Sequence, residues 1–310
     1  MLSDKTIEIL PEEAGQRLDH LLLARFPSSS RAFCRQAIEG GAVTLEGRPV
    51  PKGMKVRGGQ RFRIVTLKEA CDLRIIPNPK IRLDILFEDD ALIGINKPAG
   101  IPVQPLNTDE TETLMNGVVA RWPEVATVGD QPLMAGALHR IDTGTSGLVL
   151  AARTQEAYTQ VREQFAERKV TKVYHALVEG QIAVGNRLVH DLAHLPHSSI
   201  CRMVDARKLS RPGRVMRAET HYRPIAWYGR YTLLEVTILT GVTHQIRAQL
   251  ALAGLPIVND CLYGAKPVPE CNRHFLHAFS IALEHPTRHL PFQLVAPLTP
   301  DFEGFLQGIQ

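Results

Sequence analysis

The sequence predicts an α+β protein in two domains, the larger one built on a mixed, largely antiparallel sheet. Short apolar runs of strand type outnumber helical patterns, and several are joined by tight turns as in hairpins. Pro77 and Pro79 lie two residues apart, which neither a helix interior nor a central strand accommodates, so they mark a linker. The 310 residues suffice for one large and one small domain, which we place at residues 1–66 and 82–310 with a linker at 67–81.

The small domain is expected to contain two short helices followed by short strands. Residues 17–26 form the first helical segment, and Ser28-Ser29-Ser30 offers caps for a second helix that Gly40-Gly41 ends. On this second helix, Arg31 and Arg35 are four residues apart and share one face. This second helix is expected at residues 31–39. Strands are expected at 43–45 and 61–65, with a turn at 46–48.

Basic residues gather in two stretches of the chain. The net charge is only +4, yet residues 25–68 contain ten Lys and Arg against two acidic residues, and residues 202–230 contain eight against two. Such runs are commonly just solvated faces, but two of them favour a polyanion as partner. In the small domain, Arg31 and Arg35 join Lys52, Lys55 and Arg57 in a candidate phosphate-contacting surface.

Composition narrows the class of protein. A hydrophobic share of 44% with a charged share of 22% is ordinary for a soluble chain, and no apolar run reaches the ~18 residues of a membrane span. The first residues mix charges, so no secretory signal is expected. Five cysteines without a CxxC pair argue against a disulfide framework. We expect a cytoplasmic monomer that does not associate with membranes.

The large domain is expected to begin with a hairpin and to continue with buried strands and two helices. Asp89-Asp90 separates the two strands of the hairpin. One helix follows Thr154, and Thr243 is expected to cap a second helix that Gly254 ends. The expected strands are residues 85–88, 92–96, 147–152, 171–179 and 231–239.

A polar, glycine-containing loop precedes the strand at 147–152. It reads His139-Arg140-Ile141-Asp142-Thr143-Gly144-Thr145-Ser146-Gly147. Its glycines permit tight turns, which let polar groups converge on one pocket. On the residues alone, Asp142 fits an Asx turn as well as a catalytic carboxylate.

Segments of both domains resemble known families. Arg17-Leu18-Asp19, Ser30-Arg31 and Val43-Thr44-Leu45-Glu46-Gly47 resemble the alpha-L RNA-binding domain of the ribosomal protein S-four type, over about residues 15–63. The 139–148 loop resembles the His-Arg-Leu-Asp-x-x-Thr-Ser-Gly-Leu motif of RluA-type RNA pseudouridine synthases, with Ile141 as a conservative departure. One further segment of that family, 96–100, precedes this loop, and the others follow it in the family's order, so the resemblance spans about residues 83–298. The later segments are 172–180, 240–247, 254–257, 260–264, 276–278 and 285–286.

The second resemblance implies an isomerase that converts uridine in RNA to pseudouridine in a central cleft. Asp142 corresponds to the family's nucleophile, and Arg247 to the arginine that pairs with this carboxylate. Tyr174 corresponds to the tyrosine that stacks on the base and is a candidate general base. The isomerisation needs no redox change or group transfer, so neither a cofactor nor a metal is implied.

The resemblance also implies contacts with RNA around the target uridine. Arg140 corresponds to an arginine that fills the space left by a flipped nucleotide, and we assign His139 and Thr145 of the same loop to RNA contact. Val242 stands where the family usually has arginine, which removes a positive charge beside the expected RNA path. The small domain is expected to contribute Arg31, Arg35, Lys52 and Lys55.

Two other functions stay open. A noncatalytic RNA-binding module would use the alpha-L domain without the chemistry. A metal hydrolase is suggested by His190, His194 and His197 with Cys201 nearby, although Pro196 interrupts a helix there and no carboxylate base is suitably placed. For a pseudouridine synthase, the appended domain suits a structured substrate, so ribosomal RNA is favoured over transfer RNA.

Overall fold

The computed structural model describes residues 1–69, 73–195, 202–269 and 271–309. The chain divides into two compact units, Met1–Arg74 and Ile75–Gln310. Within the described residues, helices accompany two sheets whose strands pair antiparallel except where β7 meets β13. The predicted α+β fold class is therefore confirmed.

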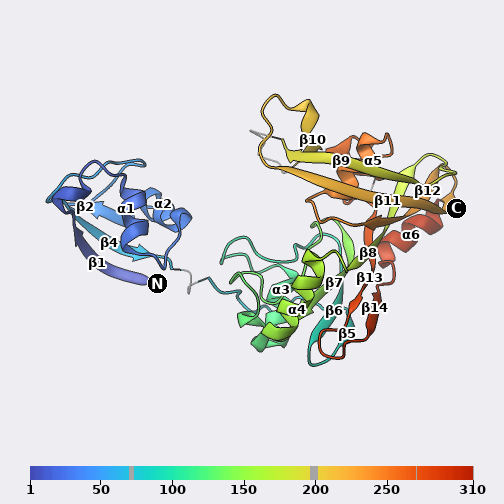
Figure 1. Ribbon diagram of the computed structural model, residues 1–310, viewed down its shortest axis with the longest axis horizontal. Coiled ribbons are helices and arrows are strands. Elements are labelled where there is room, and N and C mark those ends of the chain that lie inside the picture. Colours follow the sequence, from blue (N-terminus) through green and yellow to red (C-terminus); the bar gives the residue numbers. More distant parts are fainter. Residues whose placement is uncertain (70–72, 196–201, 270, 310) are drawn as a thin grey trace. The chain divides into compact units, whose positions relative to one another are not determined.

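The N-terminal unit combines a four-stranded sheet, in the order β1-β4-β2-β3, with two helices (Figure 1). Ser30 caps α2 as expected, because its side chain accepts a hydrogen bond from the Phe33 N–H at 3.1 Å. Strand β1 was not predicted, because Ile7 is its only buried side chain and no alternating pattern results. The elements are β1 (Leu2–Glu8), α1 (Leu18–Arg25), α2 (Arg31–Glu39), β2 (Val43–Leu45), β3 (Arg48–Pro49) and β4 (Arg61–Leu67).

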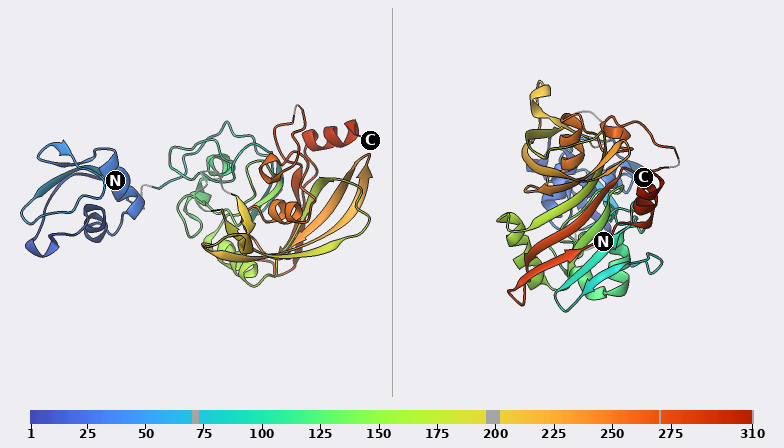
Figure 2. Two further views of the ribbon diagram at one scale, coloured as in Figure 1. Left: turned by 90° about the horizontal axis from the view of Figure 1, so that it is seen from above. Right: turned by 90° about the vertical axis from the view of Figure 1, so that its right-hand side faces the viewer.

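The C-terminal unit is built on a ten-stranded sheet in the order β10-β9-β11-β12-β8-β13-β7-β6-β5, with β14 paired to β13 (Figures 1 and 2). Four helices pack on it. The strands are β5 (Ile85–Glu88), β6 (Leu92–Lys97), β7 (Ser146–Ala152), β8 (Thr171–Glu179), β9 (Asn186–His194), β10 (Met203–Asp205), β11 (Val215–Tyr228), β12 (Tyr231–Ile238), β13 (Leu276–Glu284) and β14 (Pro291–Val295). The helices are α3 (Leu114–Arg121), α4 (Gln155–Ala166), α5 (Gln245–Leu252) and α6 (Pro300–Gly308).

Strand β7 shows how the sheet separates two cores. Val149 and Ala151 pack with α3 and α5, whereas Leu148 and Leu150 pack with α4 on the opposite face. This alternation is that of a strand buried on both faces. The loop carrying Asp142 enters β7 from the end that pairs with β13.

The start of α5 differs from the prediction. Thr243 does not cap this helix; His244 is the N-cap residue, and its backbone has φ +52°. A side chain other than glycine is uncommon in this left-handed region. In this conformation, the His244 side chain has partners in the candidate site.

Candidate active site

A tight loop leads from Asp142 into β7. The backbone N–H of Thr145 donates to the Asp142 carbonyl oxygen at 3.0 Å, which closes a turn. Directly after it, Gly147 adopts φ +110° and lies so close to β13 that a Cβ would come within 2.3 Å of the Ala278 carbonyl oxygen. Only glycine fits this position, so the contact with β13 fixes where the loop ends.

Lys97, at the end of β6, holds the same loop. Its side chain is fully buried, and Nζ donates to the carbonyl oxygens of Pro98, Ile101 and Thr143 at 2.8, 2.8 and 3.2 Å. Burial lowers the pKa of Lys97 to about 7. The sequence placed Lys97 only inside a family segment; its bond to Thr143, next to Asp142, identifies it as a positioning residue of the loop.

Arg247 of α5 links Asp142 to a second carboxylate. Its Nη1 donates to Asp142 Oδ2 at 2.9 Å, while Nε and Nη2 donate to Asp260 Oδ2 and Oδ1 at 2.7 and 2.8 Å. The bidentate contact with Asp260 fixes the plane of the guanidinium group. The side chain of Asp260 is buried, whereas that of Asp142 is 24% exposed. Asp142 is thus held firmly and stays accessible.

The positive charge of Arg247 is secured by its surroundings. Burial acts to lower the pKa of Arg247, but the hydrogen bonds and charges of Asp260 and Asp142 raise it overall. The guanidinium carbon also lies 5.2 Å from the ring centroid of Tyr263. A permanent positive charge therefore faces the Asp142 carboxylate.

His244 and Tyr263 complete this side of the site, and the sequence analysis missed both. Tyr263 Oη accepts a hydrogen bond from the Met203 N–H at 2.9 Å and lies 3.1 Å from His244 Nδ1. The Tyr263 hydroxyl can then donate its own proton to His244 Nδ1, so Nδ1 is the acceptor of the ring and its proton is expected on Nε2. Nε2 lies 3.7 Å from Asp142 Oδ2. Burial lowers the pKa of His244, which favours this neutral form.

Tyr174 lies on the same face of the sheet as α3 and α5. It is buried on β8 between Val236 of β12 and Ala278 of β13. Burial, and next the charge of Asp142, raise the pKa of Tyr174 above its ordinary value. The hydroxyl therefore keeps its proton near neutral pH, which makes it a hydrogen-bond donor in the resting enzyme and a base only if it loses that proton during the reaction.

The three remaining predicted site residues of the loop, His139, Arg140 and Thr145, differ in exposure. Arg140 is exposed, as an RNA-contacting residue would be. His139 Nε2 accepts from the Leu150 N–H at 3.1 Å, and burial lowers the pKa of His139 to about 3. Thr145 is 1% exposed and bonds His274 Nε2 through Oγ1 at 2.8 Å. Thr145 is therefore buried against His274, so we revise its role from RNA contact to positioning of the loop. His139 is only half-buried, and its contact with RNA stays a prediction.

A buried polar group supports the start of β7. Arg273 donates to Ser146 Oγ at 2.9 Å and to Asp301 at 2.6 Å. Ser146 Oγ also bonds His277 Nδ1 at 2.9 Å, and His277 Nε2 lies 3.2 Å from the Ala296 carbonyl oxygen. Burial lowers the pKa of His277 to about 4, so the ring is neutral and donates through Nε2. These hydrogen bonds therefore hold the start of β7, where the Asp142 loop ends.

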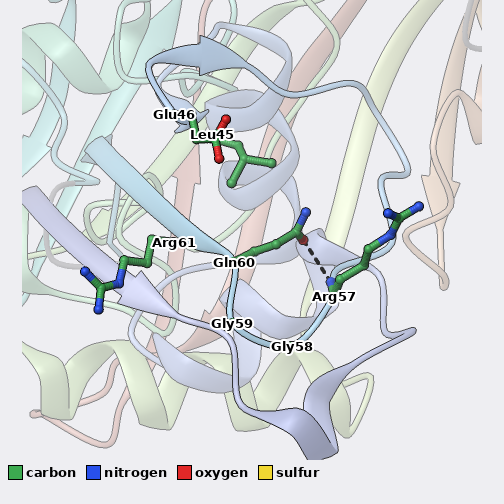
Figure 3. A pocket seen from close by; sticks show the side chains of 7 residues that line it. All are labelled: Leu45, Glu46, Arg57, Gly58, Gly59, Gln60 and Arg61. Carbon is green, nitrogen blue, oxygen red and sulfur yellow. Dashed lines mark hydrogen bonds between the residues drawn. The ribbon is translucent and has the colours of Figure 1, made fainter.

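The predicted phosphate-contacting residues of the N-terminal unit are exposed. Arg31 and Arg35 lie on α2, and Lys52 and Lys55 follow β3. Lys52 is paired with Glu39. Figure 3 shows an open hollow beside the turn at 57–61, lined by Leu45, Glu46, Arg57, Gly58, Gly59, Gln60 and Arg61.

Comparison with known proteins identifies the family. The family model described as RNA pseudouridylate synthase matches residues 91–252, and the S4 domain model matches residues 16–62. The first match covers more than half of the chain and contains Asp142, Tyr174 and Arg247. The chain belongs to the RNA pseudouridylate synthase family. The synthase is thus an isomerase acting on RNA, with an S4 domain at its N-terminal end.

Relatives of the synthase align over nearly its whole length. Ribosomal large subunit pseudouridine synthase D of Haemophilus influenzae is 32% identical, over 98% of this chain and 94% of its own. The protein of that name from Xylella fastidiosa is 36% identical, over 96% and 90%. An RNA pseudouridine synthase of Chloroflexus aurantiacus is 34% identical, over 99% and 94%. Among solved structures, human RNA pseudouridylate synthase domain containing 1 has the same fold, with a TM-score of 0.57 and 22% identity over 74% of this chain and 90% of that one.

Two alternative functions, a noncatalytic RNA-binding module and a metal hydrolase, can be compared with these findings. Family membership excludes the reading as a noncatalytic module. For the metal hydrolase, His190 and His194 lie on β9, while His197 and Cys201 lie outside the described residues. In the part of the chain that is described, no cluster of three or more His, Cys, Asp or Glu side chains could hold a metal ion. Nor does any described helix have the length and apolar character to cross a membrane.

Proposed function

We propose that the synthase isomerises uridine in ribosomal RNA, with Asp142 as the nucleophile. The observation that carries the role of Asp142 is its 2.9 Å hydrogen bond from Arg247, whose direction is fixed by Asp260. A carboxylate that is oriented, compensated and 24% exposed suits attack on a sugar or base carbon. The substrate class is supported by the names of the relatives from Haemophilus influenzae and Xylella fastidiosa.

The reaction exchanges one bond of the uracil ring for another. The N1–C1′ bond breaks with its electron pair going to uracil, the base turns, and C5 forms the new bond to C1′. The proton on C5 leaves and N1 gains one, so atoms and charge balance without a redox partner. Asp142 stabilises the electron-poor sugar carbon or adds to it or to the base, and Arg247 keeps the carboxylate in place throughout.

Tyr174 and Arg140 are proposed to hold the flipped nucleotide. The ring of Tyr174 offers a stacking face for uracil, and its protonated hydroxyl offers a donor. Arg140 is exposed and lies two residues after the buried Leu138, so it extends from a packed part of the chain. We assign it to the space in the RNA that the flipped uridine leaves.

Residues 1–66 are proposed to supply affinity for RNA rather than chemistry, as part of the unit Met1–Arg74. The predicted linker at 67–81 is narrowed at both ends, because Leu67 is buried in β4 and Ile75 belongs to the core of the second unit. Replacing Arg31, Arg35, Lys52 and Lys55 together by Gln should weaken binding and lower the slope of log K against log[salt] by about 3. Turnover at saturating RNA should be unchanged. A variant that keeps the wild-type slope would contradict this assignment. We also propose that the synthase works as a monomer in the cytoplasm.

The decisive test is Asp142→Asn. The amide keeps the size and accepts the Arg247 hydrogen bond but cannot attack, so pseudouridine formation should vanish while RNA binding persists. Activity is measured by mapping pseudouridine in total RNA from cells that lack the gene, complemented with either form. Restoration by the wild-type gene of a site in transfer RNA only would overturn the ribosomal substrate, and full activity of Asp142→Asn would overturn the catalytic assignment.

A further inference from the structure

The connection between β10 and β11 carries an unusual density of positive charge. Strand β10 is the edge of the large sheet, and residues 206–214 project from it (Figure 1). Asp205 is the only acidic residue between positions 202 and 217. Within the described part of the chain, Arg207 is the only basic residue of this segment in an ion pair, with Asp205. Six exposed basic residues share the segment: Arg202, Arg207, Lys208, Arg211, Arg214 and Arg217.

Tyr263 joins this basic segment, residues 202–217, to the active site. The Met203 N–H donates to Tyr263 Oη at 2.9 Å, and His244, which is 3.7 Å from Asp142, lies 3.1 Å from the same oxygen. The guanidinium carbons of Arg202 and Arg247 lie 5.7 and 5.2 Å from the centre of the Tyr263 ring. The two guanidinium groups are therefore at most about 11 Å apart, which is about three nucleotides of a stacked strand with a charge every ~3.4 Å.

Val242 packs at the start of the basic segment. It is half-buried and packs on the apolar cluster that contains Met203 of β10, Ala248 of α5 and Tyr263. An apolar side chain at this position thus packs β10, where the basic segment begins, against α5. The positive charge that the family pattern places at position 242 is available at this edge from Arg202 instead.

We propose that the basic segment 202–217 binds the RNA strand on one side of the target uridine. Arg202 contacts a phosphate within about three nucleotides of the flipped base, and Arg207, Lys208, Arg211 and Arg214 contact phosphates farther along. Exposed basic side chains on a segment whose Arg202 lies within about 11 Å of Arg247 match the negative charge of a nucleic-acid backbone. The proposal rests on the proposed function and adds the path of the substrate.

The test replaces Arg207, Lys208, Arg211 and Arg214 together by Gln in the full chain. The RNA probes are fragments centred on the uridine that the wild-type enzyme is found to modify, shortened stepwise from the 5′ or the 3′ end. The matched control removes the same charge from exposed residues near α3, α4 and the β13–β14 turn: Arg121, Arg168, Lys169 and Arg288.

For the wild type, KM should rise when the fragment is shortened from one end and not from the other. The variant with four Gln replacements in the basic segment should show a KM raised about 10-fold on the longest fragment and an unchanged kcat. Its KM should not rise further when the fragment is shortened from the end to which the wild type responds. The salt slope should fall by about 3. Arg202→Gln should raise KM on every fragment that keeps the three nucleotides beside the target.

Two results would overturn the proposal. One is a basic-segment variant whose KM and salt slope equal those of the wild type. The other is a control variant whose KM and salt slope change as much as those of the basic-segment variant. Both differ from failure of the proposed function, in which the wild-type enzyme itself would form no pseudouridine in ribosomal RNA.

Discussion

Arginine–carboxylate pairs occur in both units of the synthase, but in opposite environments. On the N-terminal sheet, Arg61 pairs with Glu8 across β4 and β1, with side chains 73% and 55% exposed. In the catalytic unit, Arg247 pairs with Asp260 with side chains 8% and 1% exposed. The N···O distances are 3.0 and 2.7 Å, so geometry alone hardly separates them. Their consequences differ because water screens the first pair and not the second.

The difference shows that burial decides whether an ion pair can fix the orientation of a side chain. An exposed pair contributes roughly 0.2–1 kcal/mol and adapts to its surroundings. The buried pair locks Arg247 in one orientation, because leaving either charge alone inside the protein is costly. Only the second situation can hold Nη1 in a fixed place for Asp142.

The largest effect is expected from Asp260→Asn, which leaves Arg247 buried with only Asp142 as a charged partner. The free energy of unfolding of the full chain should fall by about 3–5 kcal/mol in denaturant titrations. Asp142→Asn is the matched control: it keeps the Arg247–Asp260 pair, and its partly exposed site should cost less than about 1 kcal/mol. Equal losses in the two variants would abolish the distinction between a buried and an accessible partner.

Replacing Arg247 separates its charge from its geometry. Arg247→Lys keeps the positive charge but cannot donate to both carboxylates in a fork, so turnover should fall by ~10²-fold with RNA binding retained. Arg247→Ala also removes the compensating charge, so the acid limb of its pH–rate profile should move to higher pH and part of the activity should return as pH rises. A loss by one constant factor at every pH would leave orientation as the only role of Arg247.

Lys97 extends the comparison to a buried charge without a carboxylate partner at hydrogen-bond distance. Its pKa is about 7 in the folded enzyme and near 10.5 when unfolded, so the unfolded chain binds more protons between these values. Stability should therefore rise with pH in this window, by about 2 kcal/mol between pH 7 and 9 from this group. Lys97→Met should lose that increment, seen as the difference in pH dependence between the two unfolding curves; parallel curves would contradict the assignment.

The smallest effect is expected at the surface pair. Arg61→Ala, Glu8→Ala and the double variant should give a coupling free energy below about 1 kcal/mol, which vanishes in high salt. Pseudouridine formation should not change. A coupling as large as that of the buried pair would show that exposure does not govern these interactions.

Local patterns sufficed for some of these features and not for others. Ser30 and the apolar spacing of α2 predicted that helix, and the 139–147 segment predicted the loop that carries Asp142. The partners Asp260, His244 and Lys97 were not assigned, because their proximity to Asp142 depends on packing between distant segments. For the same reason the inward direction of Thr145 was missed: its partner His274 is 129 residues away.

That long-range dependence also sets an order of events when the chain is made. The contacts that define the N-terminal unit are closed within its first 74 residues, so it can fold while synthesis continues. The loop of Asp142 must wait for Arg247, for Asp260, and finally for the β13 strand that presses on Gly147. A growing chain therefore completes its S4 domain well before the Asp142–Arg247–Asp260 arrangement can form, and premature termination anywhere before β13 would release an S4 domain without a complete candidate site.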